Sequence, residues 1–298
     1  MPTDRPEKTV PVAGTDAAAA DLLMAEAMRV VDAIGRRGGL ARLTGGLAAR
    51  RYAIDHSFMD REFSDIDLVA PSRDHARLKS ALTELGYVEN HHVSQATAGA
   101  QLQYLRPGRL LESRSHMVKR PHPADTANVA RGAADHVDVF LDVMRMDHDV
   151  DVRGRLDIDR YALSPADVLL SKLQIGQPAG KDVHDVIGLL KDLPLGEADD
   201  NVSIDVRRLA VACAGDWGLW FDVTANLRLV AACLDDYGLA GREQTRVEER
   251  LASIAQAIAR QEKSLRFRLR ARFGTRLPWR REIEERDGPP AMAPPTAA

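Results

Sequence analysis

The sequence predicts an α+β fold: a small mixed β-sheet flanked by helices, followed by an all-helical C-terminal domain. The first half of the chain contains short apolar runs typical of strands, separated by helical segments and turn residues. After Tyr161, apolar residues recur mostly at the three- to four-residue spacing of helices. We therefore expect a disordered tail at 1–20, the sheet-containing core at 21–160, the helical domain at 161–285 and a disordered Pro/Ala-rich tail at 286–298.

Apolar spacing and turn residues predict the elements of the first half. A helix at 21–36 carries an apolar stripe and ends at two glycines. A Pro-Gly turn at 107–108 predicts a hairpin. Strands are expected at 40–44, 66–70, 101–105, 109–112 and 137–143, and helices at 47–54 and 72–85.

In the second half, Ser164 and Pro165 have the residue types that favour the cap and the first position of a helix. Periodic apolar residues then continue to about Phe273. Helices are expected at 165–174, 180–192, 204–214, 218–237 and 241–272.

Composition narrows the class of protein. The chain has 298 residues, of which 45% are hydrophobic, so it can bury a sizeable core. Its two cysteines, Cys213 and Cys233, lie in apolar segments without metal-ligand spacing, so we expect reduced thiols in a cytoplasmic protein. No run approaches the roughly 18 apolar residues of a membrane helix, and the polar N-terminus does not resemble a secretory signal. We expect no membrane partner.

The motif Ser-Asp-Ile-Asp-Leu-Val at 64–69 carries the clearest chemical signal. Side chains alternate along a strand, so Asp65 and Asp67 project to the same side. Two carboxylates so placed repel each other unless a cation lies between them. Hard divalent cations such as Mg²⁺ prefer oxygen ligands and bridge to substrate phosphates. The motif therefore predicts a metal site of the kind used in phosphoryl transfer.

A site that holds two metal ions needs one more carboxylate. The predicted strand His-Val-Asp-Val-Phe-Leu-Asp-Val supplies Asp138 and, four residues later on the same face, Asp142. We favour Asp138, because valines flank it on a strand expected at the centre of the sheet.

The pair Gly45–Gly46 precedes a predicted helix. Glycines let the backbone approach phosphate oxygens, and the first amides of a helix favour an anion. Thr44 or a backbone amide is therefore a candidate to hold a triphosphate, and Ser64, beside the first aspartate, is a further nucleotide-binding candidate.

The order of a Gly-Gly turn, the Asp-Ile-Asp strand and a later strand aspartate resembles the DNA-polymerase-β-like nucleotidyltransferase superfamily. The segment 164–190 (SPADVLLSKLQIGQPAGKDVHDVIGLL) is similar to that of AbiEii-like nucleotidyltransferases, which include toxins of toxin–antitoxin systems. The resemblance covers about 40–192, roughly half the chain. It implies that Lys172 contacts the triphosphate. It also implies that Lys181, Asp182 and Asp185 line or brace the site.

The resemblance implies an activity as well. The expected enzyme uses Mg²⁺, as two ions replaceable by Mn²⁺, to move a nucleoside monophosphate from an NTP such as ATP to an acceptor hydroxyl. Pyrophosphate leaves, Asp65 and Asp67 hold the metal, and Asp138 holds the second ion and activates the acceptor. The acceptor is RNA, such as tRNA, or a protein, with an antitoxin as a further partner.

Other functions remain open from the sequence. One is a small-molecule nucleotidyltransferase of the aminoglycoside type, and another is a non-catalytic protein that binds a nucleotide or a partner on the same fold. Eight basic residues and no acid between Lys263 and Arg281 are compatible with RNA contact or with a solvated basic helix.

Several candidates also have a purely structural explanation. A lysine such as Lys172 can extend from an apolar helix to solvent. Acids such as Asp182 and Asp185 are favourable near any helix start. The histidines lack Cys partners and regular spacing, which argues against zinc; only His136, beside the third acid, is of interest.

Overall fold

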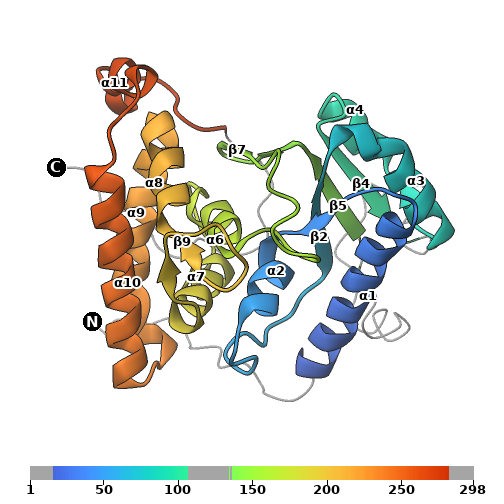
Figure 1. Ribbon diagram of the computed structural model, residues 1–298, viewed down its shortest axis with the longest axis horizontal. Helices are drawn as coiled ribbons and strands as arrows, with labels where there is room; N and C mark the ends of the chain where they lie inside the picture. The colour runs from blue at the N-terminus through green and yellow to red at the C-terminus, as the bar shows by residue number, and fades with distance from the viewer. Residues whose placement is uncertain (1–15, 107–133, 135, 282–298) are drawn as a thin grey trace, which may run out of the picture.

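In the computed structural model, which describes residues 16–106, 134 and 136–281, five strands form one mixed sheet (Figure 1). Strands β2 and β5 are parallel neighbours, and every other adjacent pair is antiparallel. The prediction of an α+β protein with a small mixed sheet is thereby confirmed. The strands, in sheet order, are β1 (Arg42–Leu43), β2 (Asp65–Ala70), β5 (His136–Leu141), β4 (Gln101–Leu105) and β3 (Val88–Glu89).

Helices of the first half pack against this sheet. The apolar stripe of α1 buries Ala27, Val30 and Ile34 completely, and α1 contacts both β1 and α3. This helix begins at Asp16, five residues before the predicted start, because Ala17–Ala20 continue its helical pattern. The helices are α1 (Asp16–Arg36), α2 (Gly45–Tyr52), α3 (His75–Glu84) after a 3₁₀ turn at Ser72–Asp74, and α4 (His91–Ala96).

The strand predicted at 137–143 is divided into two. Asp142 has a φ of 63°, in the left-handed region, which ends β5 at Leu141. The chain then forms β6 (Val143–Arg145), which pairs antiparallel with β7 (Asp149–Asp151). The strand predicted at 109–112 and its Pro-Gly turn lie outside the described residues.

The second half is mainly helical but contains a short parallel pair, β8 (Leu195–Gly196) with β9 (Ile204–Asp205), so the all-helical expectation was wrong in this detail. The helix predicted at 241–272 was also wrong as a single element. Gln261 is extended, and the Ser264 side chain accepts a hydrogen bond from Phe267 N to start a new helix. The helices are α6 (Pro165–Leu173), α7 (Gly180–Asp192), α8 (Val206–Gly215), α9 (Trp217–Cys233), α10 (Gly241–Arg260) and α11 (Leu265–Ala271), with 3₁₀ turns at Leu234–Tyr237 and Gly274–Arg276.

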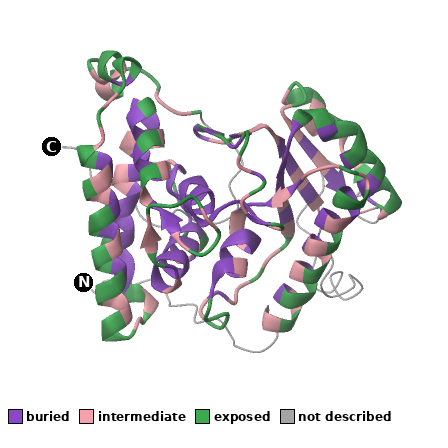
Figure 2. Cartoon of the chain, viewed as in Figure 1, coloured by how far each residue is buried: buried purple, intermediate pink, exposed green. Residues whose placement is uncertain are grey.

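One continuous cluster of buried apolar side chains joins the two halves. Helix α2, which follows β1, packs against α6 and α7 from the second half (Figure 2). The apolar faces of the sheet and of the helical half therefore share one interior, and this fixes α6 and α7 beside the strand ends that carry the acids. Within the described residues, no helix has both the length and the apolar character needed to cross a membrane.

Candidate active site

The predicted acids meet on one face of two neighbouring strands. The parallel register of β2 and β5 places Asp65 opposite His136 and Asp67 opposite Asp138. Side chains alternate along both strands, so Ile66 and Val137 turn to the buried face while these four polar residues stay partly exposed on the other face. The sequence pattern thus brings the three predicted carboxylates together and adds a histidine.

His136 lies between two of these carboxylates. Its Nε2 is 3.2 Å from Asp138 Oδ2 and 3.7 Å from Asp65 Oδ2. The hydrogen bond to Asp138, with the negative charges of Asp138, Asp65 and Asp67, raises the pKa of His136 to about 9. At neutral pH the imidazole is therefore a cation that offsets part of the local negative charge.

The surroundings of Asp67 destabilise its charged form. Desolvation by its surroundings, followed by the charges of Asp65 and Asp138, raises the pKa of Asp67 to about 7, although Lys172 and His136 act in the opposite direction. A carboxyl group in this state is stabilised as an anion by any additional positive charge. The strand face is therefore electrostatically suited to a cation.

Gly45, the first glycine of the pair, lies directly against Asp67. Gly45 has a φ of 67°, and a Cβ atom there would lie 2.2 Å from Asp67 Oδ2. The backbone N–H of Thr44 donates to the carbonyl oxygen of Asp67 at 2.9 Å, which fixes this approach. Only glycine combines this backbone conformation with this contact. Gly45 and Gly46 form the first turn of α2 rather than a turn before it.

The two predicted hydroxyl ligands have different surroundings. Thr44 is buried, and its Oγ1 lies 3.4 Å from the sulfur of Met144, so its side chain points into the interior. Ser64 is exposed and donates to Asp65 Oδ1 at 2.8 Å. Of the two, Ser64 has its hydroxyl beside the acids, whereas Thr44 reaches the site through its backbone.

Lys172 is buried on α6 and forms ion pairs with two acids of α7. Its Nζ is 2.9 Å from Asp182 Oδ1 and 2.9 Å from Asp185 Oδ2. Burial alone would lower the pKa of Lys172, but Asp185 and Asp182 raise it above its ordinary value. Lys172 also lowers the pKa of Asp67, so its charge acts on the strand acids. The explanation of Lys172 as a lysine that extends to solvent is therefore wrong. Lys181, the other lysine of the 164–190 segment, is exposed.

Arg61 completes this charged cluster. Its guanidinium donates to both oxygens of the fully buried Asp185, at 2.9 and 3.1 Å from Nη2, and lies over the Phe63 ring. A Cβ atom on Gly46 would lie 2.2 Å from the same Nη2 atom. Arg61 therefore lies beside the first turn of α2. No spacing pattern in the sequence identifies Arg61 as a site residue, because it lies in an irregular loop.

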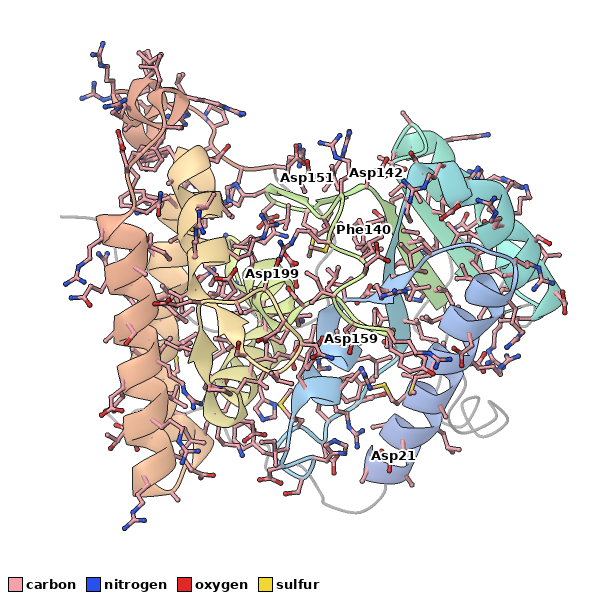
Figure 3. The ribbon with its side chains drawn as sticks, in the orientation of Figure 1. Asp21, Phe140, Asp142, Asp151, Asp159 and Asp199 are labelled. Atoms are coloured by element: carbon pink, nitrogen blue, oxygen red, sulfur yellow. The ribbon has the colours of Figure 1, made fainter. Side chains whose placement is uncertain are left out.

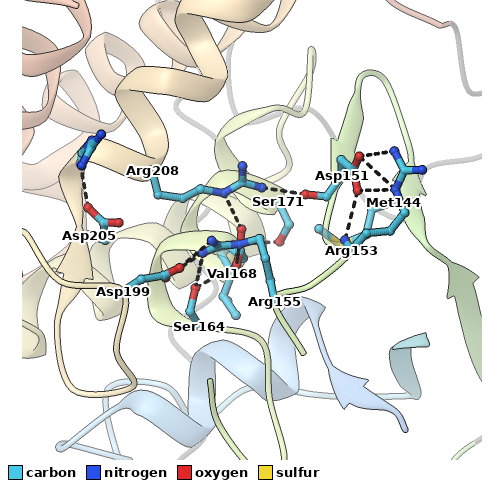
Figure 4. A network of polar contacts seen from close by, with 12 residues as sticks. Met144, Asp151, Arg153, Arg155, Ser164, Val168, Ser171, Asp199, Asp205 and Arg208 are labelled. Carbon is cyan, nitrogen blue, oxygen red and sulfur yellow. Dashed lines mark hydrogen bonds and ion pairs between the residues drawn. The ribbon is translucent and has the colours of Figure 1, made fainter. Parts of the chain in front are cut away.

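A polar network outside the site holds α6 in place. Asp167 is fully buried in the first turn of α6 and accepts from Arg155 Nε at 2.6 Å and from Arg208 Nε at 2.8 Å. Arg155 also donates to Asp199, in the loop between β8 and β9. Figure 4 shows these arginines meeting from different elements. Their paired charges fix the helix that carries Lys172.

Two neutral residues, also missed from the sequence, extend the site across the sheet. Gln103 on β4 faces Asp138 in the antiparallel register, and its Nε2 donates to Asp138 Oδ1 at 3.1 Å. Asn90 Nδ2 donates to Gln103 Oε1 at 2.7 Å. Strand alternation alone identifies the face of Gln103, but not that β4 lies next to β5.

Asp142, the alternative third acid, lies away from this group. It follows the last residue of β5, at the opposite end of the strand from His136, and accepts a hydrogen bond from Ser72 N at 3.1 Å. Figure 3 labels Asp142 near Phe140. Its left-handed backbone also breaks the alternation on which the equivalence of the two acids was based. Of the two candidates, Asp138 is therefore the one that lies beside Asp67 on the neighbouring strand.

The donor atoms of Asp65, Asp67 and Asp138 are of the type that Mg²⁺ prefers. The raised pKa of Asp67 reflects desolvation and, after it, a repulsion by Asp65 and Asp138 that a divalent cation would relieve. In the part of the chain that is described, however, no three His, Cys, Asp or Glu side chains already converge as a metal cage. Ser64, Gln103 and His136 each hold one of the carboxylate oxygens. Metal binding would require the carboxylate groups of Asp65, Asp67 and Asp138 to move closer together.

Comparison with known proteins gives no match to a family model, to a curated protein or to a solved structure.

Proposed function

We propose that this chain is a nucleotidyltransferase that moves a nucleoside monophosphate from an NTP to an acceptor hydroxyl. The observation that carries the proposal is the contact between the Gly45 backbone and Asp67, on the strand face that also holds Asp65 and Asp138. A helix start that approaches a carboxylate group so closely puts phosphate-binding amides next to oxygen ligands for a divalent cation.

The reaction is an in-line displacement at the α-phosphorus. The acceptor oxygen forms a bond to phosphorus, the bond to the oxygen bridging the α- and β-phosphates breaks, and pyrophosphate leaves. Asp65 and Asp67 would hold Mg²⁺ or Mn²⁺, with Asp138 beside a second ion. The metal, when bound, supplies positive charge to the phosphate oxygens.

This chain's own residues bind and orient the reactants. The first amides of α2, at Gly45 and Gly46, face the β- and γ-phosphates. Lys172 and Arg61 supply positive charge behind them, held in place by Asp182 and Asp185. Asp138 accepts the proton of the attacking hydroxyl, with the His136 cation beside it.

The acceptor class is a separate part of the proposal. We propose RNA or a protein, as in the toxin–antitoxin enzymes that the sequence resembles. A small-molecule acceptor of the aminoglycoside type is the second candidate, and a non-catalytic nucleotide-binding protein is the third. These three are separated by where the label goes in the following assay.

The test is transfer from each of four α-³²P-labelled NTPs with Mg²⁺, with total tRNA, cell extract or an aminoglycoside as the acceptor. Asp65→Asn and Asp67→Asn are expected to lower transfer by at least about 1,000-fold, because each removes a charged ligand while keeping the side-chain shape. Chelation with EDTA should have the same effect.

Asp142→Asn is the matched control. It makes the same chemical change at the far end of β5, and asparagine tolerates the left-handed backbone while keeping the oxygen that accepts from Ser72. It should retain full transfer. Undiminished transfer in Asp65→Asn and Asp67→Asn would refute the proposal. NTP binding that is indifferent to EDTA, with no labelled product, would favour the non-catalytic alternative.

A further inference from the structure

Asp138 is the only one of the three strand acids for which the described residues provide a neutral side-chain donor from another strand. Gln103 lies directly opposite it on β4, and the bond from Nε2 to Asp138 Oδ1 measures 3.1 Å. His136 contacts the other oxygen, Oδ2, at 3.2 Å. Two donors on two different oxygens fix the plane of this carboxylate.

A carboxamide such as that of Gln103 can present either its nitrogen or its oxygen, so its orientation must be set by a second contact. Asn90 supplies it. The Nδ2 atom of Asn90 donates to Gln103 Oε1 at 2.7 Å, and the backbone N–H of Asn90 donates to the carbonyl oxygen of Gln103 at 2.7 Å. The oxygen of Gln103 is thus directed to Asn90, and its nitrogen to Asp138.

The orientation of Asn90 is set in turn by helix α4. Asn90 is the N-cap of this helix, and its Oδ1 accepts from the backbone N–H of His92 at 3.3 Å. Its nitrogen is therefore directed to Gln103. From the start of α4 to Asp138, every donor points toward the carboxylate.

We propose that Asn90 and Gln103 are positioning residues that hold Asp138 as an oriented acceptor, a role that rests on the proposed nucleotidyl transfer. The Gln103 amide takes one oxygen of Asp138 and leaves the other in contact with His136. Residues around a metal or a catalytic acid that fix its orientation typically affect metal affinity or activity by about 10- to 100-fold.

Two substitutions break the relay, the series of hydrogen bonds from Asn90 through Gln103 to Asp138, at different points. Gln103→Leu removes the donor to Asp138. Asn90→Asp keeps the helix cap but accepts where asparagine donates, so Gln103 turns its nitrogen to position 90 and its oxygen toward Asp138. Gln101→Leu is the matched control, since Gln101 lies on the same face of the same strand but opposite Phe140.

Each variant is measured in three ways: Mn²⁺ affinity by electron paramagnetic resonance, kcat and KM for the labelled NTP, and the melting temperature. Gln103→Leu and Asn90→Asp should each weaken Mn²⁺ binding or lower kcat by about 10- to 100-fold, with the KM for the NTP within about threefold of wild type. Because the two residues act through one bond to Asp138, the double variant should be no worse than the more impaired single variant. Gln101→Leu should match wild type.

If the variants keep the Mn²⁺ affinity and kcat of wild type and only their melting temperature falls, the hydrogen bonds of Asn90 and Gln103 serve only to stabilise the sheet. That result would overturn the relay. Additive losses in the double variant would also overturn it. If the wild-type chain neither binds Mn²⁺ nor transfers label, the proposed function falls and the relay with it. If the wild type is active and the variants are unaffected, only the relay falls.

Discussion

Gly45 illustrates how one residue couples backbone conformation to chemistry. Its left-handed φ begins α2 at a point where the chain must also pass Asp67 without a side chain between them. Any Cβ would be strained by the backbone conformation and would meet the carboxylate oxygen at 2.2 Å. The glycine is therefore required twice, by geometry and by contact.

Gly45→Ala should lower the free energy of unfolding by about 1–3 kcal/mol and reduce transfer by about 100-fold, because the helix start and Asp67 must move apart. Chemical denaturation and the labelled-NTP assay measure the two effects. Gly180→Ala is the control: Gly180 lies in the first turn of α7, its φ is ordinary, and no atom lies within 4 Å of the added Cβ. Wild-type transfer by Gly45→Ala would contradict the assigned contact.

Asp159 has a purely structural role, as the acceptor of several hydrogen bonds. It accepts from the backbone N–H groups of Tyr161 and Ala162 at 2.8 and 2.9 Å, and from the side chains of Arg51 and Asn201. Burial alone would raise the pKa of Asp159, but these donors lower it to about 2. The turn that leads from β7 to α6 is therefore stabilised by an ionised carboxylate.

A folded-state pKa below the unfolded value means that the stabilisation is present above about pH 4 and is lost as the pH falls toward 2. Asp159→Asn should therefore cost roughly 2 kcal/mol at pH 7, with the difference from wild type shrinking below about pH 4. Urea denaturation between pH 2 and pH 7 measures this. Asp157→Asn, at an exposed acid two residues earlier, should follow the wild-type curve. A constant difference across the range would exclude the carboxylate charge as the cause.

At the scale of elements, the clearest departure from expectation is the break between α10 and α11. The end of the helix predicted at 241–272 is instead a separate short helix, α11. In and just after it, the apolar residues Leu265, Leu269 and Phe273 are exposed at four-residue steps. Phe267 anchors it against Trp220. In Figure 1, α11 projects at one extremity of the described chain, beyond α8 and α10.

Its basic residues divide into two groups. Arg270 donates to the carbonyl oxygens of Gly274 and Leu277, so it holds the segment together. Among the described residues, the side chains of Arg268, Arg272 and Arg276 form no hydrogen bond or ion pair with the protein. These three are the ones free to contact an anionic acceptor.

If the acceptor is RNA, the triple substitution of Arg268, Arg272 and Arg276 by Gln should weaken RNA binding by about 10-fold or more at 100 mM salt, because each lost phosphate contact reduces counterion release. The KM for the NTP should stay unchanged. Filter binding over a range of salt concentrations and the transfer assay measure the two quantities. A control with Arg207, Arg228 and Arg242 changed to Gln removes the same charge from other exposed positions. Equal RNA binding by both triple variants would exclude a specific role for α11.

The elements differ in how far the sequence predicts them. Strand β2 and helices α6 and α7 have strong periodicity, and Ser164 and Pro165 mark the start of α6. These three elements occur close to where they are expected. Two-residue strands such as β3 and β8 contain too few positions for any periodic signal. The division of β5 from β6 depends on one left-handed residue, Asp142, which alternation of apolar residues does not reveal.

The sequence predicts those residues of the candidate site that can be identified from the pattern of a single strand. Asp65 and Asp67 follow from alternation, and Asp138 follows from a second strand of the same kind. Gln103 and Arg61 required knowledge that β5 is inserted between β2 and β4 and that the loop before β2 returns to α7. Such contacts between distant segments are set by the fold as a whole.

At the scale of the whole molecule, the shared interior of the two halves predicts joint unfolding. Ile187 on α7 is completely buried, and this helix packs against α2 and α6. Ile187→Ala should lower the free energy of unfolding by about 2–5 kcal/mol, and both halves should unfold together. All three tryptophans lie in the second half, so their fluorescence reports that half, while hydrogen exchange of β2 and β5 reports the sheet.

The same measurements on Lys181→Ala, at an exposed position of α7, provide the control and should reproduce wild type. Loss of tryptophan signal at a denaturant concentration where β2 and β5 still resist exchange would show two independent units.

The continuous interior also limits how such a chain can evolve. A gene segment encoding residues 21–160 would not be inherited or exchanged as a self-sufficient module, since α6 and α7 complete the packing beneath α2 and supply Lys172 and Asp185. An early stop codon in the second half would leave a chain that cannot complete this shared interior. Diversification is instead expected at the periphery, through point changes around α4 and α11, where new contacts leave the common interior intact.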